Sequence, residues 1–185
     1  MTPYEAALGT RFHHLSPQVR QLHGARNPSW AGQVTVERGA TPFAGLAAGM
    51  LGFPKSMEKS PFKLTLETGA DGSETWVRDF NGHKTISTIR SSEPGQLEEI
   101  FGSTRLKLST QVKADQLHMR VIAAALWGRI SLPARLVPRS RAHVWQDEAG
   151  RYRFDIESDI PLGGRLIRYF GWLRPDAPQG FATDR

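Results

Sequence analysis

The feature that most constrains this chain is a succession of short segments in which apolar and polar residues alternate. Such alternation predicts half-buried β-strands. Tight-turn residues separate the segments, among them Gly69–Gly72, Asn81-Gly82 and Glu93-Pro94-Gly95, and Asn-Gly is a strong hairpin signal. The predicted strands are residues 30–39, 62–68, 74–80, 84–90, 96–101, 105–112, 117–127, 141–146, 152–160 and 165–173.

Three short helices are predicted besides the strands. Two lie near the N-terminus, where Thr2-Pro3 and Ser16-Pro17 supply a capping residue followed by proline. A third is predicted over residues 43–51, after Thr41-Pro42, and it is inserted between the first and second strands.

These elements predict a mainly β fold, an antiparallel meander of about ten strands. Because a long meander must curl or close to dispose of its edges, we expect a curved sheet or a barrel. The order of one strand, a helix and then a run of strands is also that of the intracellular lipid-binding barrels, an analogy of architecture alone. We expect one domain over residues 1–174, and a flexible proline-rich tail over 175–185.

Composition excludes several classes of protein. The chain has no cysteine, which rules out disulfides and thiolate metal sites. It contains neither a signal-peptide pattern at its start nor an apolar run long enough to span a bilayer, and we therefore expect a cytoplasmic protein. The net charge is +6, but the basic residues are dispersed, so no specific nucleic-acid binding is predicted.

The predicted inserted helix is apolar nearly all round, from Phe43 to Phe53. A helix without a polar face is usually buried, which favours a plug or lid for a barrel end. The alternative is peripheral contact with a membrane surface, with Arg38, Lys55 and Lys59 alongside.

The strand over residues 74–80 supplies the first candidate site. Period-two geometry places Glu74, Trp76, Arg78 and Phe80 on one face. If the two aromatic rings face the core, Arg78 lies between them and needs an acid, a carbonyl or a ligand anion as partner. Glu99 and Glu74 are the acids expected nearby, and a salt bridge is favoured over a ligand site.

The last strand repeats this pattern with two possible inner faces. Arg168 and Trp172 share one face with Leu166 and Phe170, and Tyr169 lies on the other. With the first face inward, Arg168 would join Arg78 and suit a carboxylate or phosphate. The candidate ligand-binding residues are Arg78, Arg168, Trp76, Phe80, Glu99, Phe154, Tyr169 and Trp172.

No catalytic residue and no metal ligand is predicted. The six histidines are scattered over different elements, although His118 and His143 fall on strands that could be neighbours. No serine has the nucleophile-elbow motif. Asp155, Glu157 and Asp159 alternate along one strand face, which we expect to be solvent-exposed.

Several segments together resemble a bacterial family known as domain of unknown function 4166. The resembling segments are LSPQVRQLHG (15–24), VTVERG (34–39), ETWVRDF (74–80), LEEIFGSTRLKL (97–108) and FDIESDIPLGGRLIRYFGWL (154–173). In that family the domain stands alone or follows a nicotinamide-cofactor dehydrogenase-like domain. The resemblance therefore implies a possible reductase-like partner, but it supplies no site residue. The glycine-rich stretch 45–52 lacks the strand and acid of a dinucleotide site, so no cofactor is predicted in this chain.

Three functional hypotheses remain. The first is a binding module that holds a small amphipathic or anionic ligand inside a barrel. The second is an accessory or interaction domain with a packed interior, which acts on a fused or separate reductase. The third is an enzyme of unfamiliar type. A cavity in the interior would favour the first over the second.

Overall fold

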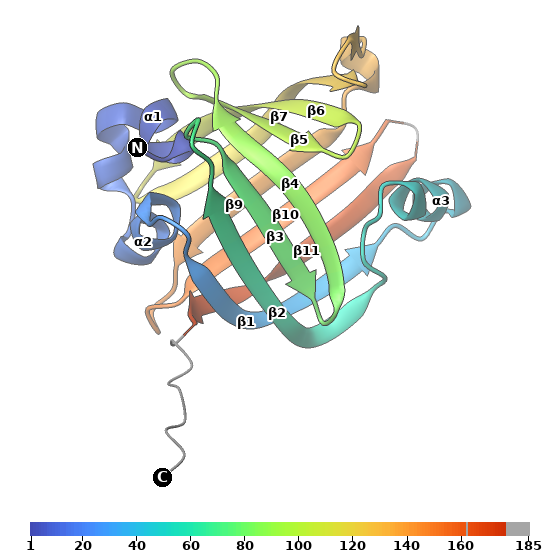
Figure 1. Cartoon of the computed structure of the whole chain (residues 1–185). Helices are drawn as coiled ribbons and strands as arrows, with labels where there is room; N and C mark the ends of the chain where they lie inside the picture. The colour runs from blue at the N-terminus through green and yellow to red at the C-terminus, as the bar shows by residue number, and fades with distance from the viewer. Residues whose placement is uncertain (162, 177–185) are drawn as a thin grey trace.

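The protein forms a closed barrel of ten antiparallel strands, seen in a computed structural model that describes residues 1–161 and 163–176 (Figure 1). The sheet runs in the order β6-β5-β4-β3-β2-β1-β11-β10-β9-β7-β8, and pairing of β6 with β7 closes it. The strands are β1 (Ser29–Arg38), β2 (Met57–Thr68), β3 (Glu74–Phe80), β4 (His83–Ser91), β5 (Gln96–Phe101), β6 (Thr104–Lys113), β7 (Gln116–Leu126), β8 (Ile130–Ser131), β9 (Arg139–Gln146), β10 (Tyr152–Ile160) and β11 (Gly164–Pro175).

The predicted fold class is therefore confirmed, and most strand boundaries differ by a few residues at most. The main additions are the two-residue strand β8, which pairs with the end of β7, and the 3-10 helix η1 (Gly9–His14). A second 3-10 helix, η2 (Ala134–Leu136), lies in the break between strands at residues 133–138. β11 extends to Pro175, and Asp176 forms an ion pair with Lys63. The rest of the predicted tail, 177–185, lies outside the described residues.

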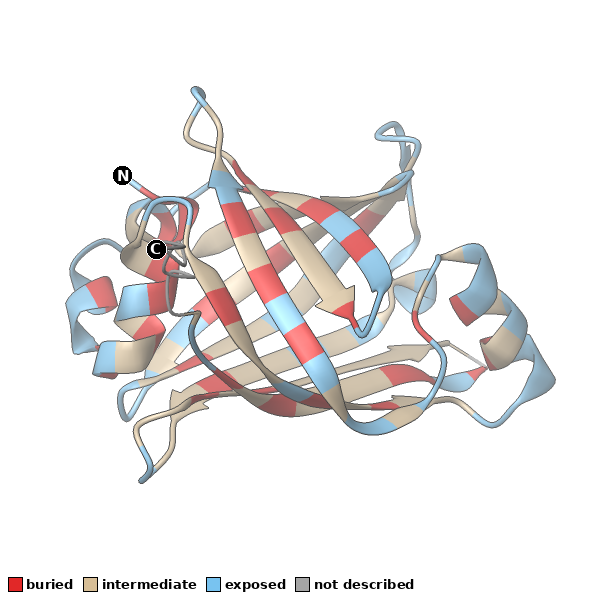
Figure 2. Ribbon diagram, turned by 60° about the horizontal axis from the view of Figure 1, so that its bottom comes forward, coloured by how far each residue is buried: buried red, intermediate tan, exposed pale blue. Residues whose placement is uncertain are grey.

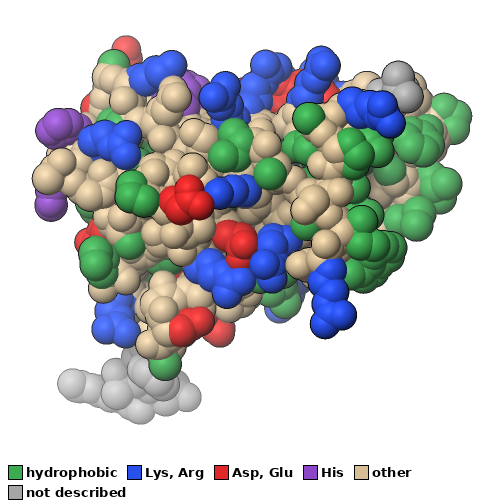
Figure 3. Space-filling view, turned by 90° about the horizontal axis from the view of Figure 1, so that it is seen from above, with side chains coloured by type: hydrophobic (Ala, Val, Ile, Leu, Met, Phe, Trp, Pro, Cys, Tyr) green, Lys and Arg blue, Asp and Glu red, His purple; other side chains and the backbone are tan. Residues whose placement is uncertain are grey.

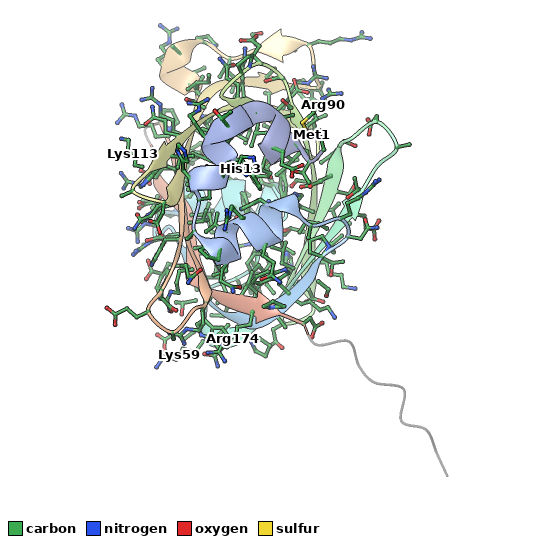
Figure 4. The ribbon with its side chains drawn as sticks, turned by 90° about the vertical axis from the view of Figure 1, so that its left-hand side faces the viewer. Met1, His13, Lys59, Arg90, Lys113 and Arg174 are labelled. Carbon is green, nitrogen blue, oxygen red and sulfur yellow. The ribbon has the colours of Figure 1, made fainter. Side chains whose placement is uncertain are left out.

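The helices α1 (Pro3–Leu8) and α2 (Pro17–Gly24) cover one end of the barrel (Figure 4). Thr2 and Glu5 form a complete capping box at the start of α1, as each side chain bonds the other's backbone N–H. The apolar face of each helix is buried, with Tyr4 and Leu22 among the least exposed side chains of the core. These two helices therefore form a plug.

The helix α3 (Pro42–Met50) is largely exposed, although its apolar sequence favours burial. It lies outside the barrel, beside β11 at the end opposite the plug (Figures 1 and 2). The small residues Ala44 and Ala48 face the barrel, whereas Phe43, Leu46 and Met50 are exposed by 61%, 65% and 81%. Burial of the small-residue face lets the helix pack closely, and it leaves the bulky residues on the opposite face in solvent.

The outer face of β10 and β11 carries several paired charges. Arg168 binds Asp155 through two hydrogen bonds of 3.0 and 2.8 Å, and Glu157 bonds Arg141 and Arg165. Of the two possible inner faces of this strand, the one with Arg168 and Trp172 therefore faces outward, so these two candidate residues do not line the interior. Ile167, Tyr169 and Leu173 point inward instead, because their apolar and aromatic surface fills the interior while Arg168 gains a carboxylate outside.

Candidate functional site

A cavity of about 200 Å³ runs inside the barrel from the plug to the opposite end. Its wall is mostly apolar and aromatic, and it comes from nearly every strand. The cavity-facing members of the predicted set are Trp76, Arg78, Phe80, Glu99, Phe154 and Tyr169. Protein interiors seldom contain voids larger than a water molecule, so this space distinguishes the interior from a packed core.

Three neighbouring strands place a polar cluster on the cavity wall. Arg78 on β3 donates to the hydroxyl of Ser87 on β4 at 2.8 Å and to Oε1 of Glu99 on β5 at 3.1 Å. The Ser87 hydroxyl donates to the same Glu99 oxygen at 2.7 Å. The Arg78 side chain is 12% exposed and that of Glu99 is 18% exposed. The structure therefore shows the internal salt bridge that sequence reasoning favoured.

The charge of the cluster is balanced. Burial disfavours the Arg78 cation, but Tyr169 and Glu99 outweigh burial and hold the pKa of Arg78 above its ordinary value. Burial also raises the pKa of the Tyr169 phenol, against the effect of Arg78, so that this group stays neutral. Arg78 further lies over the Trp76 ring, 5.1 Å from its centroid. The wall thus offers hydrogen-bonding groups without a net charge.

The plug end of the cavity holds a second set of buried polar groups. His23 and the Tyr152 hydroxyl are joined by a hydrogen bond of 3.1 Å, and burial lowers the pKa of His23 to about 3. Glu74 accepts a hydrogen bond of 3.1 Å from the Trp76 indole, not from Arg78. Its other oxygen has no partner among the described residues, and burial raises the pKa of Glu74 to about 7.

The other end of the cavity is spanned by the loop between α3 and β2. Phe53 from this loop stacks on Phe101 at the end of β5, with ring centroids 5.3 Å apart. Arg38 fastens the loop by donating to the carbonyls of Pro54 and Phe53. The lid predicted for the inserted helix is therefore formed by the loop that follows it, and this end is called the mouth below.

The outer wall has a separate groove of about 450 Å³ around His118 and His143. These histidines face each other across β7 and β9, and their rings stack with centroids 4.4 Å apart. Within the described ranges no group of three or more potential ligands could hold a metal ion. The polar groups beside the groove include Glu157, already paired with Arg141, so the interior remains the stronger candidate site.

Sequence reasoning missed several groups of the interior. Ser87, which joins Arg78 to Glu99, is an ordinary strand serine, and only its inward position on β4 could have singled it out. Tyr4, His23 and Tyr152 meet through residues distant in the sequence. No local pattern predicts that two N-terminal helices close a barrel.

Two solved structures are among those with which this fold can be compared. One is a protein of unknown function from the DUF3598 family of Nostoc punctiforme, with a TM-score of 0.50 and 11% identity over 81% of this chain and 47% of that chain. This chain therefore spans about half the length of that protein. The other is Rv2717c of M. tuberculosis, with a TM-score of 0.45 and 14% identity over 88% of this chain and 99% of that chain. The first likeness shows the fold alone.

None of the curated proteins matches the sequence. In the described part of the chain, every helix is too short or too polar to cross a membrane. The family model for the domain of unknown function DUF4166 matches residues 15–173, which include β1 to β10 and most of β11. The chain therefore belongs to the DUF4166 family.

Proposed function

We propose that this protein is a binding module that holds one small amphipathic molecule inside its barrel. The observation that carries the proposal is the mostly apolar cavity of about 200 Å³ with the Arg78, Ser87 and Glu99 cluster on its wall. Ligand pockets combine an apolar lining with a few placed polar groups in this way. An accessory domain with a packed interior would not need this space.

The cluster favours a neutral polar group on the ligand. Glu99 already neutralises Arg78, so an anion placed there would meet the Glu99 charge in a poorly hydrated interior. A hydroxyl or carbonyl can instead bond the Arg78 cluster and the Tyr169 phenol without a desolvated net charge. We therefore infer a ligand with an apolar body and an alcohol or carbonyl end.

The test compares octanol and octanoate as probes, because they share a chain and differ in the charge of the polar end. Binding is followed by calorimetry and through tryptophan fluorescence, to which Trp76 on the cavity wall contributes. We expect octanol to bind and octanoate to bind at least about tenfold more weakly, since burying an unpaired charge is costly. Tighter octanoate binding would contradict the neutral ligand.

Cavity filling provides the control for location. Leu106→Trp adds bulk to a side chain on the cavity wall, whereas Ile86→Trp adds the same group to an outward-facing residue of β4. We expect the first variant to lose octanol binding and the second to retain it. If neither probe binds the unmodified protein, or if both variants bind octanol equally, the binding-module proposal fails.

A further inference from the structure

The exposed large apolar side chains of this protein are concentrated on two segments. Nine such side chains are exposed among the described residues, and six of them lie on α3 or on the connection from β7 to β9. Those six are Phe43, Leu46 and Met50 on α3, and Trp127, Ile130 and Leu136 on the connection. Scattered apolar residues on a surface are ordinary, but a concentration of this kind marks an interaction site.

Both segments lie at the mouth end of the barrel (Figures 1 and 2). In the space-filling view the hydrophobic side chains gather at the right-hand end, where α3 lies in Figure 1 (Figure 3). The cavity lining identifies the same end, because it includes Phe53, which follows α3, and Pro138, which follows η2. The two apolar segments therefore lie beside the entrance to the cavity.

The charges on these segments all have the same sign. No acidic residue occurs between Glu37 and Glu58, and the basic residues in that stretch are Arg38 and Lys55. No acidic residue occurs between Asp115 and Asp147 either, and the basic residues there are Arg120, Arg129, Arg135, Arg139 and Arg141. Acid-free stretches also occur elsewhere, as in residues 6–36, but that stretch carries no exposed large apolar side chain. Other charges are paired, as on the outer face of β10 and β11.

We propose that the mouth end docks on a membrane surface that contains anionic lipid. Bulky apolar side chains on segments that carry cations and no acids suit the interface between lipid headgroups and acyl chains, and tryptophan is enriched there. A protein partner of ordinary composition would not require that both exposed apolar segments carry cations and no acids. The evidence for docking comes from the surface residues alone. The role of docking rests on the proposed function, since docking would bring the cavity entrance to a source of amphipathic molecules.

The experiment measures co-sedimentation of the full chain with two kinds of vesicle, one of phosphatidylcholine and one of phosphatidylcholine mixed with phosphatidylglycerol. We expect binding to the mixed vesicles that weakens as salt is raised, because Lys and Arg near an anionic surface each strengthen binding about fivefold. Leu46→Glu should weaken binding to the mixed vesicles at least about tenfold. It removes an apolar side chain that the bound protein would bury in the membrane, and it adds a negative charge that the anionic lipid repels.

Ile86→Glu is the matched control, since Ile86 is also exposed, by 56%, but lies on the outer wall of β4. It changes the net charge equally, and we expect it to lose no more than about the fivefold effect of a single charge. Circular dichroism checks that both variants are folded. The charge contribution is tested separately by Arg135→Gln, which should weaken binding to the mixed vesicles and leave that to phosphatidylcholine unchanged.

Equal losses in Leu46→Glu and Ile86→Glu, or no binding to mixed vesicles at low salt, would overturn the membrane proposal. So would self-association of the chain that Leu46→Glu abolishes while vesicles stay unbound, because the surface would then be an interface between copies. The cavity-filling variant Leu106→Trp separates the two proposals, since it should lose octanol and still bind vesicles.

Discussion

Arg78 and Arg168 lie on antiparallel strands, each within a salt bridge, but on opposite sides of the barrel wall. Arg78 and Glu99 are held in a poorly hydrated interior, where each charge depends on the other. Arg168 and Asp155 keep side-chain exposures of 32% and 30%, so water screens their interaction. The two arginines therefore form a matched pair for measuring what burial adds to a salt bridge.

We expect Arg78→Met to lower the free energy of unfolding by about 3 kcal/mol, because it leaves Glu99 buried and unpaired. Arg168→Met should cost less than about 1 kcal/mol, as exposed pairs usually do. Urea unfolding of both variants measures the difference. The double variant Arg78→Met with Glu99→Met should recover most of the loss, since it removes both charges. Equal costs at the two sites would show that the interior pair is well hydrated.

Glu74 makes a prediction about pH. Its pKa is raised from the ordinary value of 4.5 to about 7 by burial, so the folded protein holds this proton more tightly than the unfolded chain does. The resulting stabilisation is complete below pH 4.5 and is lost as the pH rises through about 7. Glu74→Gln, which stays neutral, should therefore gain up to about 3 kcal/mol relative to the unmodified protein between pH 5 and pH 8.

The measurement is urea unfolding at both pH values, compared between the two proteins. The comparison is needed because His23, with its pKa lowered to about 3, acts in the opposite direction and lowers stability as the pH falls below 6.5. Subtracting the Glu74→Gln variant cancels that contribution. A difference that does not change with pH would mean that Glu74 is charged in the folded protein.

At the scale of elements, β1 and β11 approach each other too closely at two glycines to admit a side chain. A Cβ atom added at Gly171 would overlap the carbonyl of Gln33, and one added at Gly32 would overlap the carbonyl of Trp172. The two strands pair along nearly their whole lengths, so neither backbone can move alone. These two glycines therefore allow β11, the last strand, to pack closely against β1, the first strand.

Gly171→Ala should therefore destabilise the protein by about 2 kcal/mol or more, through overpacking against backbone. Gly45→Ala on α3 is the control, because a Cβ there meets nothing within 4 Å. Replacing a glycine inside a helix should stabilise the protein by about 0.5–1 kcal/mol. Urea unfolding measures both. Similar effects of the two substitutions would show that β1 and β11 separate readily to admit a side chain.

At the scale of the whole molecule, the barrel has a plug at one end and an apolar, basic mouth at the other. The net charge of the chain is +6, and its positive charge is unevenly distributed. The segments 38–57 and 116–146, which form much of the mouth, contain basic residues and no acidic ones. Weak, salt-sensitive binding to nucleic acid stays our prediction, because the cations do not form one continuous track. The cations and the exposed apolar side chains of the mouth together suit a membrane surface, which offers anionic headgroups above apolar acyl chains.

The sequence by itself determined the features that depend on neighbouring residues. Alternation and turn residues predict the strands, and period-two geometry alone places Trp76, Arg78 and Phe80 on one face. Only the tertiary structure decided that Tyr169 and not Arg168 faces inward, since both faces of β11 carry bulky apolar side chains and the choice depends on which partners the neighbouring strands supply. It also decided that Ser87 joins Arg78 to Glu99 and that α3 buries its alanines, because these contacts join segments whose meeting is set by barrel closure and by no local pattern.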